Sequence, residues 1–194
     1  RTQFENVLLL DAGNALWSTR SPSRQAEGKL MIDAMNLMGY DAMAIGDQEL
    51  QLGPEVLQQR MVEATFPFLS ANLVLASSGE LLAQPYVLLE MGGRKVGIIG
   101  LTCELVQLSV TQAGEQYTLL SAKDVLTQYV TELAEHTDII IVLSNMGYEP
   151  DQHFSSLVPG IDLIVGGRSA IPMPAGWRSD ETGTIVVQAG SYGE

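Results

Sequence analysis

The sequence predicts an α/β protein with a layered sheet. Short apolar runs, rich in β-branched and aromatic residues, alternate along the chain with segments of helical periodicity. Between two of these runs stands Gly92-Gly93, which is the two-residue spacing of a tight hairpin. The chain has 194 residues, of which 46% are hydrophobic and 17% charged. This composition is globular, and the length suits a single domain with a sizeable core.

The expected strands are short, and glycine or proline bounds most of them. The first is an apolar run that ends at Asp11-Ala12-Gly13, so we interpret it as a buried strand that leaves the sheet at a loop. Strands are expected at 7–10, 42–45, 66–70, 86–91, 96–101, 139–143, 161–165 and 184–189.

Three helices have recognisable ends. A helix over 26–38 is expected to end at Gly39, a residue suited to the C-cap. A helix over 54–64 begins with proline, which favours the first turn. The third, over 121–136, opens with Ser121 and has Asp124 three positions later, a start that is similar to a capping box. The apolar face of the first helix is expected to consist of Leu30, Met31, Ala34, Met35 and Met38.

Charge and cysteine content exclude several classes of function. A net charge of −13, with ten scattered basic residues, argues against binding of nucleic acid or an anionic membrane through a basic face. The chain has no apolar stretch of roughly 18 residues, the length that a membrane span requires. Its single cysteine, Cys103, has no partner for an internal disulfide and follows an apolar run, so we expect it to be buried.

Four short motifs lie at or directly after predicted strands. They read DAGN at 11–14, GDQE at 46–49, LSNMG at 143–147 and GGRSA at 166–170. The chain resembles the metallophosphoesterase domain of the 5'-nucleotidase family, which has DAGD, GNHE, LSHLG and GGHSH at these places. Other stretches are similar to that family in the same order, and together they cover nearly the whole chain. They lie at 29–46, 66–73, 95–102, 160–167 and 188–194.

The resemblance implies a four-layer α/β/β/α sandwich of the metallophosphoesterase type. It also implies a pair of divalent metals at the strand ends, hydrolysis of nucleotide phosphoesters, and an extracytoplasmic setting (periplasmic, secreted or cell-surface). No signal peptide is visible, and the chain begins at Arg1. The family's opening strand with its Asp-x-His ligands and its C-terminal nucleoside-binding domain have no counterpart in these residues. We therefore expect 1–194 to be a single domain that is truncated at both ends.

The motifs differ from the family pattern at the residues that carry its chemistry. By the resemblance, Asn14 replaces the aspartate that bridges both metals, and Asp47 replaces a ligand asparagine. Gln48 replaces the catalytic histidine, and glutamine has no proton to transfer near neutral pH. Asparagine is a poor transition-metal ligand, alanine is none, and arginine brings a permanent positive charge. Three metal-binding histidines are replaced by Asn145, Arg168 and Ala170.

The remaining polar residues of the candidate pocket have structural interpretations. We expect Asp11 to orient the loop after the first strand, and Glu49 to support the local loop. Asn72, at the end of a strand, is expected to make a side-chain-to-backbone hydrogen bond. For Arg168 we favour an internal pair with Asp47 over direct binding of an anion, because buried charges are normally paired.

The two histidines of the chain lie outside the motifs. His136 is expected at the end of a helix, and His153 on a helix after Pro150-Asp151. Since neither matches a family position, we expect a structural or solvent-exposed role for both.

Three functional hypotheses follow. The first is a non-catalytic scaffold or binding domain without a cofactor. The second is a divergent hydrolase of nucleotide phosphoesters. It would need metal ligands from a segment upstream of these residues together with Asp11, Asn14, Asp47 and Asn145, and such an oxygen site would suit Mg, Mn or Ca better than Zn. The third is a module in which Arg168 binds a small anion or nucleotide without turnover. The sequence does not specify a protein partner or a state of self-association.

Overall fold

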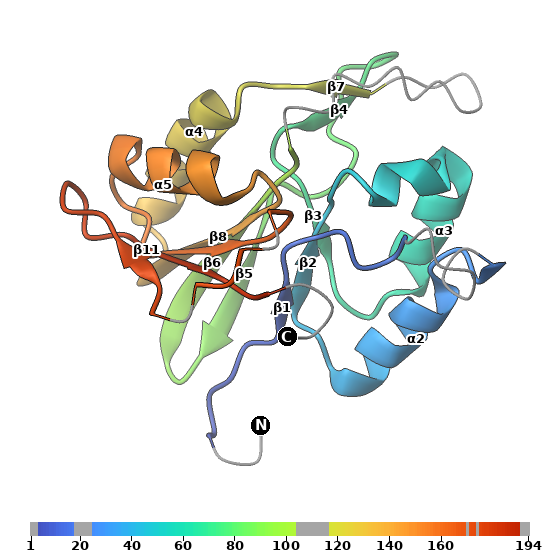
Figure 1. Ribbon diagram of the computed structural model, residues 1–194, viewed down its shortest axis with the longest axis horizontal. Helices are drawn as coiled ribbons and strands as arrows, with labels where there is room; N and C mark the ends of the chain where they lie inside the picture. The colour runs from blue at the N-terminus through green and yellow to red at the C-terminus, as the bar shows by residue number, and fades with distance from the viewer. Residues whose placement is uncertain (1–3, 18–24, 104–116, 170, 174, 191–194) are drawn as a thin grey trace.

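The computed structural model describes residues 4–17, 25–103, 117–169, 171–173 and 175–190. In Figure 1, two sheets lie back to back in the middle of the molecule, with a pair of helices on each outer side. The fold is therefore a four-layer α/β/β/α sandwich, which confirms the predicted class.

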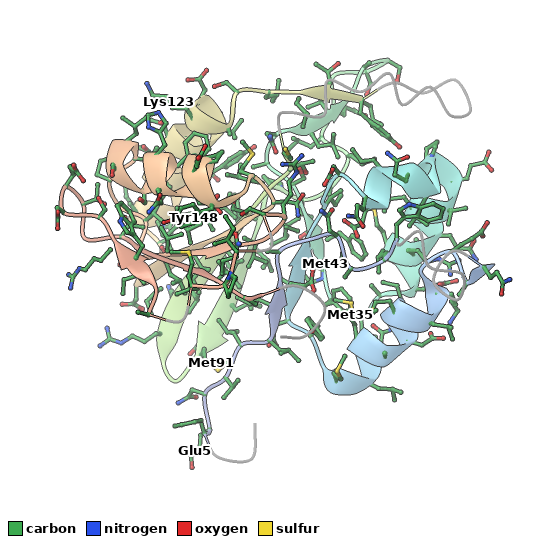
Figure 2. The ribbon with its side chains drawn as sticks, viewed as in Figure 1. Glu5, Met35, Met43, Met91, Lys123 and Tyr148 are labelled. Atoms are coloured by element: carbon green, nitrogen blue, oxygen red, sulfur yellow. The ribbon has the colours of Figure 1, made fainter. Side chains whose placement is uncertain are left out.

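The smaller sheet has three parallel strands in the order β1-β2-β3. They are β1 (Leu10–Asp11), β2 (Ala42–Ala44) and β3 (Phe68–Leu69). The helices α2 (Lys29–Met38) and α3 (Pro54–Glu63) cover its outer face, and a 3-10 helix, η1 (Glu49–Leu52), lies between β2 and α3. In Figure 2, Met35 of α2 and Met43 of β2 lie in the apolar layer between this sheet and its helices.

The larger sheet has six strands in the order β10-β11-β9-β8-β6-β5. Its inner strands are parallel, while β5 and β10 run antiparallel to their neighbours. Its outer face is covered by α4 (Ala122–Ala134) and α5 (Tyr148–Leu157). The strands are β5 (Tyr86–Met91), β6 (Arg94–Leu101), β8 (Ile139–Ser144), β9 (Leu163–Gly166), β10 (Trp177–Arg178) and β11 (Ile185–Gln188); β4 (Leu73–Leu75) and β7 (Tyr117–Leu119) form a separate antiparallel pair.

Alternation along the strands divides the core into three layers. In β2, Met43 faces the helices α2 and α3, whereas Ala42 and Ala44 face the space between the sheets. In β6, Ile98 joins this central layer and Ile99 packs towards α4. Small residues in β2 let the two sheets approach closely, so the strand ends of both sheets are near one another.

Several local predictions are confirmed. β5 and β6 form a hairpin in which Met91 pairs with Arg94, and both turn glycines have positive φ, 59° at Gly92 and 75° at Gly93. At the start of α4 the Ser121 hydroxyl accepts a hydrogen bond from the backbone N–H of Asp124. Cys103 is buried.

The predicted apolar face of α2 is wrong in part. Ile32 and Met35 are the buried residues, while Leu30 is 64% exposed and Met38 52% exposed. Because apolar residues lie all around this helix, its periodicity is compatible with several buried faces. Packing against the small sheet determines which face is buried. Met31 lies on the exposed side as well.

Strand boundaries also differ from the predictions. The first strand pairs only over Leu10–Asp11 rather than 7–10, because pairing requires a neighbour in β2. β4, β7 and β10 were not predicted, since two or three residues are too few to show a strand period. Among the described residues, no helix has the length and apolar character needed to cross a membrane.

Candidate functional site

The four motifs meet where the two sheets meet. The first two follow β1 and β2 of the small sheet, and the other two follow β8 and β9 of the large sheet. Each pair is parallel, so its two strands end at the same edge of their sheet, and bonds of Asn145 to the Ala12 and Asp47 backbone bring the two edges together. The carboxyl ends of parallel strands are where α/β proteins place their sites.

A chain of hydrogen bonds links the motifs across the sheet boundary. The Asn14 Nδ2 donates to Asp47 Oδ1 at 2.9 Å, and the backbone N–H of Gln48 donates to Asn14 Oδ1 at 3.0 Å. From the large sheet, Asn145 Oδ1 accepts from the backbone N–H of Asp47 at 3.3 Å, and its Nδ2 donates to the Ala12 carbonyl at 2.8 Å. Both asparagine side chains therefore have donor and acceptor engaged with protein groups.

Arg168 completes this arrangement. Its Nε lies 3.6 Å from Asp47 Oδ1, with side-chain exposures of 30% for the arginine and 28% for the aspartate. The ion pair expected from the sequence is therefore present, in a half-buried rather than a buried setting. Arg168 has a φ of 73°, a left-handed conformation that is uncommon for a residue with a long side chain. Ala170, at the last motif position, lies outside the described residues.

Glu49 holds the loops of the small sheet together. Its carboxylate accepts hydrogen bonds from the backbone N–H groups of Asn14, Leu16 and Gly46, at 2.7, 3.0 and 2.9 Å. The side chain is fully buried, and this loss of water raises the pKa of Glu49 to about 7 in spite of the three donors. Glu49 thus has the loop-supporting position that the sequence analysis predicts.

Asp11 and Asn72 also make local contacts. Asp11 Oδ1 accepts from the Gly13 N–H at 2.8 Å, and burial raises the pKa of Asp11 to about 6. Asn72 donates to the Thr102 carbonyl and accepts from the Thr102 N–H, at 2.8 and 2.9 Å. The hydroxyl of Thr102 in turn donates to the Ile45 carbonyl, so Asn72 joins the two sheets behind the motifs.

A second polar cluster, which the sequence did not lead us to expect, joins the LSNMG motif to α5. Ser144 donates to Asp151 of α5 in a short hydrogen bond, and the other carboxyl oxygen of Asp151 has no hydrogen-bond partner among the described residues. Burial raises the pKa of Asp151 to about 8. A sequence signal existed, because Asp151 shares the inner helical stripe at i, i+3, i+4 and i+7 with Phe154, Ser155 and Val158.

A further contact fixes the GGRSA motif. The hydroxyl of Ser169 accepts from the backbone N–H of Tyr148 at 2.8 Å and donates to Gln188 Oε1 at 3.0 Å. Tyr148 is the first residue of α5 and is labelled in Figure 2. The segment that carries Arg168 is therefore attached both to a helix start and to β11.

The residues present do not fit a pair of divalent cations. Such a site needs several carboxylates and imidazoles that converge on one point, but here both asparagine oxygens already accept backbone hydrogen bonds. Within the described residues, no group of three or more His, Cys, Asp or Glu side chains is placed to hold a metal ion. The guanidinium of Arg168 adds positive charge where a cation would have to bind.

The histidines do not supply the missing ligands. His136 follows the end of α4, and His153 lies on α5, as predicted. Both are exposed, and His153 has a ring contact with Phe154.

The sequence is similar to those of several known proteins. Protein UshA of Yersinia enterocolitica is 37% identical over 158 residues, which cover 72% of this chain and 28% of that protein. A snake venom 5'-nucleotidase of Gloydius brevicauda is 33% identical over 175 residues, 87% of this chain and 29% of that protein. The chain therefore spans less than a third of the length of these relatives. No family model matches it.

Comparison of the fold with solved structures identifies the same group of proteins. The crystal structure of a 5'-nucleotidase precursor from Thermus thermophilus superposes with a TM-score of 0.86 and 30% identity, and covers 97% of this chain and 40% of the solved one. Relatives in sequence and in structure are thus 5'-nucleotidases and related phosphoesterases, and the part that matches is a 5'-nucleotidase-like metallophosphoesterase domain.

Proposed function

We propose that this chain, which matches the metallophosphoesterase domain of the 5'-nucleotidases in sequence and in fold, is a non-catalytic member that serves as a scaffold or binding domain. Its strands and loops bring the four motifs together as a phosphoesterase requires. At the metal positions, Asn14 and Arg168 instead contact the Asp47 side chain, and Asn145 bonds to the backbone of Ala12 and Asp47.

One observation carries the proposal. The two asparagines, Asp47 and Arg168 each have a protein partner at the site, and the contacts of Asn145 and Arg168 cross from the large sheet to the small one. A two-metal hydrolase uses its cations to generate hydroxide and to clamp the phosphate. The motifs contain no bridging carboxylate and no imidazole, so these residues lack the ligands that would hold the two cations. Gln48 also has no proton to donate to a leaving group.

The arrangement favours the scaffold over the other two hypotheses. A divergent hydrolase would need the oxygens of Asn14 and Asn145 for a cation, and each of these oxygens already accepts a hydrogen bond from a backbone N–H. An anion-binding module would need the charge of Arg168 for a ligand, whereas Arg168 already has an ion pair with Asp47, with 3.6 Å between Nε and Oδ1. The motifs hold three acids, Asp11, Asp47 and Glu49, against one base, which disfavours a phosphate.

The decisive experiment measures metal content and turnover on the full-length protein. After dialysis against EDTA and reloading with Mn²⁺, Mg²⁺ or Zn²⁺, we expect less than stoichiometric metal by elemental analysis. Hydrolysis of AMP and of p-nitrophenyl phosphate should equal that of a heat-denatured sample. One or two bound equivalents with metal-dependent turnover would overturn the proposal. A T. thermophilus 5'-nucleotidase, treated identically, serves as the positive control.

We also infer an extracytoplasmic setting for the whole protein. The resemblance supports it, and the relative from Gloydius brevicauda is by its name a venom protein and hence secreted. Cell fractionation with antibodies against residues of this domain tests the inference. Recovery in the cytoplasmic fraction alone would contradict it.

A further inference from the structure

The outer side of α2 carries an apolar stripe that the described part of the structure leaves exposed. Four long side chains of this helix are in contact with water, with exposed fractions that range from 39% at Met31 to 90% at Leu37. Single exposed apolar residues are common, but a contiguous patch of them on one face is often functional. The stripe consists of Leu30, Met31, Ala34, Leu37 and Met38.

The stripe points away from α3. Successive residues of a helix are turned by about 100°, so Asn36 lies roughly 160° around α2 from Ala34. The Asn36 Nδ2 donates to the Glu63 carbonyl at 2.9 Å, and its Oδ1 accepts from the backbone N–H of Thr65 at 2.8 Å. The end of α3 is therefore on the opposite side of α2 from the stripe. In Figure 1, α2 accordingly lies at the margin of the molecule.

The stripe is symmetric about its small central residue, Ala34. Leu30 and Met31 precede Ala34 by four and three positions, and Leu37 and Met38 follow it by three and four. In an antiparallel pair of identical helices about a two-fold axis at Ala34, the two residues before it lie at the level of the two that follow it in the other copy. The small side chain at the centre lets the two helices approach closely. The stripe is therefore complementary to a second copy of itself.

The charges of α2 do not oppose such a pair. The net charge of −13 makes two copies of the chain repel one another, so contact is most favourable where the surface is locally neutral. All five residues of the stripe are uncharged. The charged residues of α2, Lys29 and Asp33, form an ion pair with each other. An approach along α2 thus brings together two surfaces whose helices carry no net charge.

We propose that two copies of this protein associate through α2, as an antiparallel helix pair about a two-fold axis at Ala34. The exposed side chains of the stripe present on the order of 300 Å² of apolar surface in each copy. This is less than the roughly 800 Å² per partner of a stable complex, so the association is weak, with a Kd on the order of 50 µM. It does not depend on metal content and is separate from the proposed loss of catalysis.

Sedimentation velocity of the full-length protein, from about 1 to about 500 µM, tests the association. The weight-average sedimentation coefficient should rise from that of a monomer towards that of a dimer. Leu37→Gln should raise the Kd at least about tenfold, because the two-fold axis removes a leucine from both sides of the contact. Leu157→Gln is the matched control, since Leu157 ends another helix, α5, and is 45% exposed. It should keep the Kd of wild type.

Both variants are expected to fold. Leu37 and Leu157 are exposed, so replacement by glutamine should leave the Tm within about 2 °C of wild type. If Leu37→Gln does not fold, Leu30→Gln removes the same contact from the other end of the stripe and should weaken association in the same way.

The response to salt identifies the kind of contact. Between about 50 mM and about 500 mM NaCl, screening weakens the repulsion between two acidic copies, and an apolar contact is retained. The Kd should therefore decrease as salt is added. A Kd that increases over this range would indicate ion pairs between the copies and would overturn a contact through the stripe.

A cross-link tests the position of the axis. A residue on a two-fold axis meets its own copy, so Ala34→Cys should form an intermolecular disulfide under mild oxidation. Gln58→Cys, at an exposed position of α3, is the matched control and should remain monomeric in a non-reducing gel. Cys103 is buried and should not contribute. Equal cross-linking of the two variants would exclude the antiparallel pair.

The outcomes are distinguishable from those of the proposed function. A full-length protein that stays monomeric up to the highest concentration, or a dimer that Leu37→Gln leaves unchanged, overturns the association through α2 and does not affect the non-catalytic proposal. Stoichiometric metal with turnover in a protein that dimerises through α2 overturns only the non-catalytic proposal.

Discussion

At the scale of single residues, Asn14 and Asp47 show a compensated exchange. The resemblance places an aspartate at the first position and an asparagine at the second, and this chain has the two residue types reversed. The reversal keeps an amide opposite a carboxylate, with Asn14 Nδ2 2.9 Å from Asp47 Oδ1. In this chain the hydrogen bond from the Asn14 amide to the Asp47 carboxylate is charge-assisted, whereas the bridging carboxylate that the resemblance implies at position 14 is lost.

This exchange predicts a non-additive pair of variants. Asn14→Asp should lower the free energy of unfolding by about 2 kcal/mol, because it replaces a donor with an oxygen that repels Asp47. Adding Asp47→Asn should recover at least half of the loss by restoring an amide opposite a carboxylate. Urea denaturation in EDTA measures both values. Strict additivity of the two single variants would contradict the exchange.

At the scale of elements, β6 approaches the small sheet at Gly100. The backbone N–H of Ala71 donates to the Gly100 carbonyl at 2.8 Å, which ties the segment after β3 to the large sheet. A Cβ at Gly100 would lie 2.4 Å from the Leu69 carbonyl oxygen, so β3 and β6 can approach only because this side chain is absent. That approach brings the motifs of both sheets within hydrogen-bond distance.

We therefore predict a large difference between two alanine substitutions on the same strand. Gly100→Ala should destabilise the protein by about 3 kcal/mol, because Leu69 backbone atoms must move. Gly97→Ala should cost less than half as much, since its Cβ would meet the ends of the Leu133 and Thr137 side chains at 3.0 and 3.2 Å, and these can shift. Thermal and urea unfolding of both variants test this, and equal losses would show that the sheet contact is not limiting.

At the scale of the whole molecule, burial of acids sets how stability depends on pH. Asp151 has a pKa of about 8 in the folded state, and Glu49 and Asp11 are shifted in the same direction. Such an acid keeps its proton in the folded state at pH values where the unfolded chain has already released it. It therefore stabilises the folded state at low pH, and this contribution is lost as the pH rises. The net charge of −13 adds self-repulsion once all acids are ionised.

The stability of the protein should consequently fall between about pH 4, where the unfolded aspartate ionises, and about pH 8, where Asp151 ionises in the folded state. The urea midpoint is expected to decrease from pH 5 to pH 8, and Asp151→Asn should flatten this decrease. Substitution of the exposed Glu55 by Gln is the matched control and should leave the slope unchanged. A midpoint that rises over this range would contradict the prediction.

Much of the fold could be predicted from local patterns. The β5–β6 hairpin follows from two adjacent glycines, and the start of α4 from the Ser121 hydroxyl, because these signals act within a few residues. The buried face of α2 could not be predicted in this way. Leu30 and Ile32 are both apolar, and only packing against the small sheet decides that Ile32 is buried and Leu30 exposed. The cluster of Ser144 and Asp151 required the packing of α5 against the large sheet.

The sequence by itself determined that the motifs lack histidine and a bridging carboxylate, because residue identity is fixed in the chain. Only the tertiary structure decided what these replacements do. Asn14, Asp47, Asn145 and Arg168 are separated by many residues along the chain, and their hydrogen bonds and ion pair exist because two sheets end at the same place. Polar interactions act over a few ångströms, so their partners depend on packing rather than on sequence order.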